Sequence, residues 1–251
     1  MDVDEDIESR LLRINSRFKQ PNESNTNFTF LYTGANLVRM QLVKLTCARM
    51  FANIYPPYNT INLDGTLYTI PTGMYTAEQL ASEVTSVVVG MTCTLNANNK
   101  FSLTGSGVMA PTRLSTLLMG FPDNLFYLPF PNNPNNPNYE LEATSPPSLA
   151  GPDPIYIEST DLALSNCFDH DNSNSGSIPL VWSVNCSTVP YGFTIGWESN
   201  DAELNRIDVK NSTFSNRTFH IKLTDQYGHV LVLPETAHVD LIFKVFYQTN
   251  K

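Results

Sequence analysis

The sequence predicts an all-β fold, a two-sheet antiparallel sandwich that carries two short helices and an N-terminal arm. The first observation is the alternation near the C-terminus, where Phe219, Ile221 and Leu223 are separated by polar side chains. This period of two is typical of a half-buried strand. The second observation is the 17 prolines among 251 residues, which indicate many short strands joined by irregular loops. A chain of this length buries a sizeable core without disulfides.

The composition excludes several classes of protein. Charged residues make up 16% of the chain and hydrophobic residues 41%, so this is not a disordered acidic protein. The net charge of −9 repels phosphate backbones, so we expect no direct contact with nucleic acid. No apolar run approaches the roughly 18 residues that a membrane helix needs, and we expect no membrane span. The acidic N-terminus lacks the positive region of a secretory signal.

The cysteines give no sign of a metal centre or of a disulfide framework. None of them forms a CxxC pair or another zinc spacing, and we expect all of them to be reduced: Cys47, Cys93, Cys167 and Cys186. The sequence also lacks G-x-S-x-G, P-loop and H-E-x-x-H motifs. We therefore expect no enzymatic activity, no metal and no cofactor.

Residues 1–24 are predicted to form an N-terminal arm. An acidic stretch is followed by apolar residues at helical spacing, namely Ile7, Leu11, Ile14 and Phe18. This spacing predicts a short amphipathic helix, and the alternative is a solvated terminus. These apolar side chains have no obvious place in a complete sandwich, so we expect the arm to bind neighbouring subunits.

Residues 25–249 are predicted to form a single domain. Its first half contains an alternating strand with Phe28, Phe30 and Tyr32, and a helix that begins after Thr76 as N-cap and runs to about Val89. The other elements expected there are an extended run over 37–50, a strand over 67–70, a hairpin over 91–95 and 100–104, and a second short helix over 114–119.

The second half begins with a Pro/Asn-rich loop over 122–153, from which no core can be built. The strands expected after this loop are 155–159, 178–184, 193–198, 207–209, 217–224, 229–233 and 239–247. The last strand places Val239, Leu241, Phe243, Val245 and Tyr247 on one face. Its other face carries Ile242 and Phe246, which a solitary sandwich would expose, so we expect another subunit to cover them.

Several residues of possible chemical function are better explained by structure. His170 lies among Asp and Cys side chains, but its polar loop favours a solvated tip over a metal site. Glu198 and Glu203 do not stand out as the carboxylate pair of a glycosidase. Trp182 and Trp197 could stack on sugars, yet both fall in alternating runs, which favours packing in the sandwich.

Three stretches resemble a known family. They are "INSRFKQPNESNTNFTF" at 14–30, "IPTGMYTAEQLASEV" at 70–84 and "RTFHIKLTDQYGHVLVLPETAHVDLIFKVFY" at 217–247. Their order resembles the single jelly-roll penton and minor capsid proteins of icosahedral double-stranded DNA viruses, in the virophage, polinton and large nucleocytoplasmic virus lineage. The resemblance spans residues 14 to 247, and the Pro/Asn loop departs from it.

The resemblance implies a single jelly roll of about eight strands. It implies a structural virion protein, a penton at the five-fold vertices of the capsid that assembles inside the host cell. The partners implied are further copies of the chain, as a pentamer, the major capsid protein and other minor capsid proteins. The alternatives are a minor or cement protein between major capsomers, a receptor- or glycan-binding head, and a jelly-roll enzyme. The residues expected at the interfaces are Ile7, Leu11, Ile14, Phe18, Ile242 and Phe246.

Overall fold

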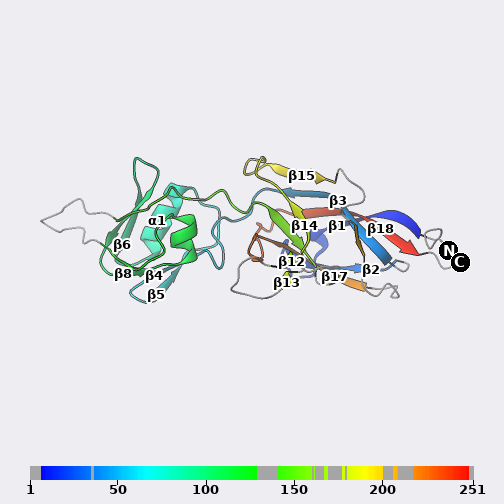
Figure 1. The fold of residues 1–251 in the computed structure, drawn as a ribbon, viewed down its shortest axis with the longest axis horizontal. Coiled ribbons are helices and arrows are strands. Elements are labelled where there is room, and N and C mark those ends of the chain that lie inside the picture. Colours follow the sequence, from blue (N-terminus) through cyan, green and yellow to red (C-terminus); the bar gives the residue numbers. More distant parts are fainter. Residues whose placement is uncertain are drawn as a thin grey trace, which may run out of the picture. The chain divides into compact units, whose positions relative to one another are not determined.

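The computed structural model describes residues 7–34, 37–128, 141–159, 161, 167–168, 177–178, 180–199, 206–208 and 217–248. The chain divides into two compact units (Figure 1). Unit 1 consists of Met1–Phe51 and Pro152–Lys251, and unit 2 is Ala52–Gly151. This division differs from the single domain that the sequence predicts over 25–249, because the middle of the chain packs around a core of its own.

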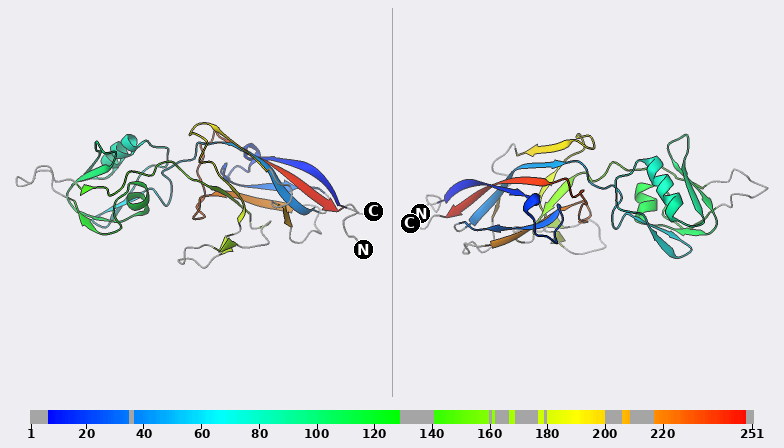
Figure 2. Two further views of the ribbon diagram at one scale, coloured as in Figure 1. Left: turned by 45° about the horizontal axis from the view of Figure 1, so that its top comes forward. Right: turned by 180° about the vertical axis from the view of Figure 1, so that it is seen from behind.

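Unit 1 is a sandwich of two antiparallel sheets (Figures 1 and 2). Sheet A has the order β1–β18–β3–β15, and β16 also pairs with β3; its strands are β1 Ile7–Asn15, β3 Leu37–Ala48, β15 Thr194–Glu198, β16 Arg206–Asp208 and β18 Val239–Gln248. Sheet B has the order β14–β11–β17–β2, with β2 Asn27–Tyr32, β11 Ile155–Glu158, β14 Leu180–Val184 and β17 Arg217–Thr224. A separate pair is formed by β12 Cys167–Phe168 and β13 Ser177–Ile178. The predicted all-β, jelly-roll fold class is confirmed.

The core of the sandwich consists of the side chains that every second residue of its strands directs inward. In β18 the buried side chains are Val239, Leu241, Phe243 and Val245, which confirms the predicted inner face. In β17 the buried side chains are Phe219, Ile221 and Leu223. The ring centroids of Trp182 in sheet B and Phe243 in sheet A lie 5.3 Å apart, so these two aromatic rings join the sheets.

The predicted helix near the N-terminus is wrong, because this segment is a strand of the sandwich. β1 pairs with β18 along its whole length, from Ile7 opposite Gln248 to Asn15 opposite Asp240. The apolar residues at helical spacing also satisfy a period of two in part, and β18 offers an edge with unpaired backbone groups. A 3-10 turn, η1 Ser16–Phe18, follows the strand. Residues 7–24 are therefore not an arm separate from the domain.

Unit 2 contains two small sheets and two helical segments. One sheet has the order β5–β4–β8–β9, with β4 Thr60–Leu63, β5 Thr66–Thr69, β8 Val108–Ala110 and β9 Phe126–Tyr127. The other has the order β10–β7–β6, with β6 Met91–Leu95, β7 Phe101–Gly105 and β10 Leu141–Glu142. The helical segments are α1 Ala77–Val87 and the π-helix η2 Leu114–Leu118. The predicted helices and the predicted hairpin are confirmed.

The start of α1 shows why its prediction succeeded. Thr76 accepts a hydrogen bond from the Gln79 backbone N–H, and the Gln79 side chain accepts one from the Thr76 backbone N–H. This capping box satisfies two donors that the helix itself cannot pair. Leu80 and Val84 then face the core of unit 2.

The structure also tests the strand predicted over 229–233 and the loop predicted over 122–153. The strand predicted over 229–233 is wrong, since the segment forms only an isolated bridge between Thr224 and Val230. The predicted loop over 122–153 contains the short strands β9 and β10 in its described part. Residues 129–140 of that loop lie outside the described residues.

Candidate assembly surfaces

The register of β1 and β18 brings together most of the predicted interface residues. Leu11 lies opposite Lys244 and Ile7 opposite Gln248, so these side chains share a face with Ile242 and Phe246. This is the outer face of sheet A, because Leu241 and Phe243 point into the sandwich. Leu11 is 68% exposed, whereas Ile242 and Phe246 are half-buried.

The two remaining predicted interface residues lie elsewhere. Ile14 is only 7% exposed and belongs to the core of the sandwich, and its role at an interface stays a prediction. Its burial follows from its pairing with Leu241, because the side chains of both residues point into the sandwich. Phe18, at the end of η1, is 83% exposed.

The outer face of sheet A mixes these apolar side chains with ion pairs. Arg13 lies 2.7 Å from the carboxylate of Asp240, and this hydrogen bond raises the pKa of the Arg13 guanidinium. Lys44 donates to Glu198 and thereby lowers the pKa of that carboxyl. Arg13 and Lys44 lie on either side of Ile242, so charged and apolar side chains alternate across this face. Such a mixed surface is compatible with an interface that forms between folded subunits.

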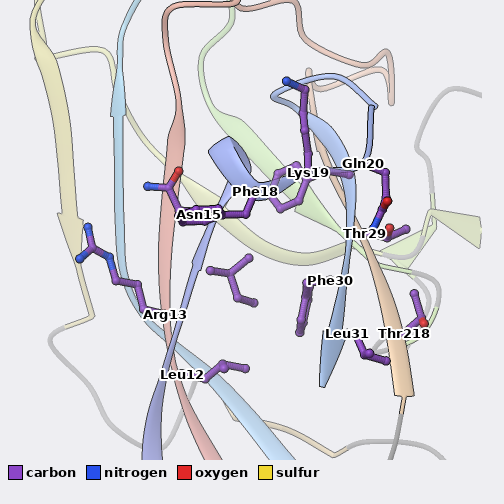
Figure 3. A pocket seen from close by; sticks show the side chains of 12 residues that line it. Leu12, Arg13, Asn15, Phe18, Lys19, Gln20, Thr29, Phe30, Leu31 and Thr218 are labelled. Atoms are coloured by element: carbon purple, nitrogen blue, oxygen red, sulfur yellow. The ribbon is translucent and has the colours of Figure 1, made fainter. Parts of the chain in front are cut away.

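A groove of about 500 Å³ opens where β1, η1 and β2 meet (Figure 3). Among the described strands, β1 ends the order of sheet A and β2 ends that of sheet B, so the groove lies along one open side of the sandwich. Its lining residues are Leu12, Arg13, Ile14, Asn15, Phe18, Lys19, Gln20, Phe28, Thr29, Phe30, Leu31 and Thr218. In Figure 3, Leu12 on β1 lies across the groove from Phe30 and Leu31 on β2.

The walls of the groove are held in place by contacts behind them. Phe30 stacks on Phe219, with ring centroids 5.1 Å apart. The carboxylate of Glu23 accepts hydrogen bonds from the backbone and the hydroxyl of Thr29. Burial opposes ionisation of Glu23, but the hydrogen bonds from Thr29 and Gln20 outweigh it and lower the pKa of this carboxyl. A preformed groove loses little conformational entropy when a partner binds.

Sequence reasoning missed the groove and most of its residues. Leu12 falls outside the helical spacing of Ile7, Leu11, Ile14 and Phe18, and Leu31 lies on the other face of its strand from Phe28, Phe30 and Tyr32, so neither residue belongs to the pattern that was read. Leu31 is 62% exposed beside the aromatic alternation of β2. Only the strand order shows that both residues lie at the open side of the sandwich.

The other residues considered for chemistry have structural surroundings. Trp182 is buried, which removes it as a platform for sugars, and Trp197 is half-buried opposite Leu45. Glu198 is paired with Lys44, while Glu203 and His170 lie outside the described residues.

Three of the four cysteines are buried free thiols, namely Cys47, Cys93 and Cys186. Burial raises the pKa of Cys47 and Cys93 to about 12, so both are protonated at neutral pH. In the described part of the chain, no three His, Cys, Asp or Glu side chains gather to hold a metal ion. No helix within the described ranges is long and apolar enough to cross a membrane.

Comparison with known proteins gives a likeness in fold and none in sequence. No protein-family model and no curated protein matches the sequence. The crystal structure of the mavirus penton protein matches over 96% of this chain and 100% of that chain, with a TM-score of 0.50 and 10% identity. The chain has the fold of a virophage penton protein. A chain of the Sputnik virophage, from its electron cryo-microscopy structure, matches over 96% of this chain and 98% of that one, with a TM-score of 0.42 and 14% identity.

Proposed function

We propose that the protein is a structural component of a viral capsid and that it forms the penton at the five-fold vertices. The observation that carries this proposal is the likeness in fold to the mavirus penton protein over nearly the whole of both chains. The order of the three sequence stretches at 14–30, 70–84 and 217–247 supports it independently.

The proposed penton role also specifies the partners of the chain. Copies of the chain associate as a pentamer, and the outer face of sheet A, with Leu11, Ile242 and Phe246, contacts the major capsid protein or another minor capsid protein. A sandwich suits this work because its sheets are rigid, while its faces and edges are free to bind neighbours. The net charge of −9 disfavours direct contact with the genome.

Labelling of particles purified from the virus that encodes the chain tests this function. A small epitope tag is added at the C-terminus, and gold-labelled antibody is counted by position on the particles. The proposal predicts label at the five-fold vertices and a copy number far below that of the major capsid protein. Label spread between the capsomers supports the cement protein instead, and absence from purified particles contradicts any role in the capsid.

A further inference from the structure

We propose that the groove between β1 and β2 receives an aromatic knob from the next copy of the same chain. The knob consists of Tyr191 and Phe193, and this contact closes the ring. The inference rests on the proposed ring and deepens it by naming the two surfaces that meet.

The knob is exposed yet firmly held. Tyr191 is 45% exposed and Phe193 is 64% exposed. Their loop, residues 185–193, is fixed to the end of β3: the Arg49 backbone N–H donates to the Phe193 carbonyl at 2.8 Å, and the Gly192 N–H donates to the Arg49 carbonyl at 2.9 Å. Gly192 has a φ of 84°, a conformation that other residues adopt at a cost. Two large apolar side chains on a fixed loop are suited to insertion into a partner.

The knob and the groove lie on opposite sides of the sandwich. The groove is bounded by β1 and β2, which begin the order of sheet A and end that of sheet B. The knob loop connects β14 to β15, and these are the strands at the other ends of the same two orders. A contact between different surfaces on opposite sides is heterologous, so repeating it produces a closed ring or an open filament.

The register of sheet A favours the closed ring. Four residues on neighbouring strands pair in one row across the sheet, namely Asn15, Asp240, Thr46 and Gly196. Past this row, β1 continues into η1 with Phe18, and β15 is preceded by Phe193. Because β1 and β15 run in opposite directions, both aromatic residues lie past the same end of the sheet. When two subunits lie side by side, the knob of one is therefore at the same height along the strands as the groove of the next. A closed ring has no displacement along its axis from one subunit to the next, whereas a filament requires one.

The chemistry of the two surfaces also matches. Half of the twelve residues that line the groove are aliphatic or aromatic, with Leu12, Phe30, Leu31 and Phe18 among them, and the other half are polar. A groove of about 500 Å³ has room for large side chains, and a buried aromatic residue removes roughly 150–250 Å² of surface from water. Binding of the knob would cover exposed apolar surface on both subunits at once.

Cross-linking between separately purified variants tests the pairing. Phe193→Cys marks the knob and Leu31→Cys marks the rim of the groove, and the unchanged chain gives the background from its native cysteines. We expect a short bismaleimide to join the two variants into dimers only when they are mixed. Dimers formed by Phe193→Cys alone would show knob meeting knob and would overturn the inference. So would a mixture that forms rings without cross-links.

Substitution tests whether the same contact holds the ring together. We expect Phe193→Ser and Leu31→Ser each to raise the dissociation constant of the ring about tenfold or more, with the melting point of the free subunit unchanged. Val89→Ser is the matched control, because Val89 is an exposed apolar residue of unit 2.

The outcomes separate this inference from the proposed function. Rings that are as stable in Phe193→Ser as in Val89→Ser overturn the knob-and-groove contact and leave the penton proposal intact. An unchanged chain that stays monomeric at all concentrations overturns both. Rings lost only in the knob and groove variants support both.

Discussion

At the scale of single residues, the sandwich depends on side chains that join its two sheets. Phe243 is fully buried and its ring meets that of Trp182 in the facing sheet. We expect Phe243→Ala to lower the free energy of unfolding by about 3–5 kcal/mol, because it leaves a cavity between the sheets. Urea denaturation measures this change. Phe246→Ala on the other face of β18 is the control, and an equal loss in both variants would contradict the assigned faces.

A second residue links stability to pH. Glu158 is buried beside Thr224 and Asp225. Burial raises the pKa of this carboxyl above the ordinary value of 4.5, the Asp225 charge adds to the shift, and the Thr224 hydroxyl and Lys222 oppose it. Between the unfolded and the folded pKa, the folded state therefore binds more protons, and stability falls as pH rises through that window.

Glu158→Gln removes this titration while keeping the size of the side chain. We expect the variant to lose part of the decline in unfolding free energy between acidic and neutral pH, as measured by urea denaturation at a series of pH values. Glu235→Gln is a control, because that side chain is 82% exposed. An unchanged pH dependence in Glu158→Gln would show that Glu158 does not contribute to it.

At the scale of elements, β1 belongs to the folded sandwich. It pairs with β18 over nine residues and places Ile14 in the core. We expect deletion of residues 1–15 to lower the melting temperature strongly, since it removes an edge strand and exposes β18. Deletion of residues 1–6 is the control, because it keeps the whole strand. A 1–15 deletion that melts like the full chain would restore the separable arm.

Local patterns predicted those elements whose own sequence determines them. The alternation of β17 and β18 and the cap of α1 at Thr76 needed no knowledge of their neighbours. β1 was missed because Ile7, Leu11, Ile14 and Phe18 fit a helical period as well, and only pairing with β18 decides between the two. The outer face of sheet A was foreseen from Ile242 and Phe246, whereas the groove depends on strand order, which no local pattern contains.

At the scale of the whole molecule, two units with separate cores share one chain. Unit 2 is inserted between β3 and β11 of the sandwich, and local periodicity does not show the insertion because strands of both units alternate in the same way. The sandwich supplies two different surfaces on opposite sides, the knob and the groove. Such a pair gives each subunit two neighbours, which is the requirement for a cyclic assembly.

The mass of the purified chain in solution is the sharpest test of whether the chain is a ring-forming capsid protein. Native mass spectrometry across a range of protein concentrations resolves the number of subunits in each species. We expect a pentamer that dissociates to folded monomers on dilution. A monomer at every concentration, or a closed two-fold dimer as the largest species, would contradict it.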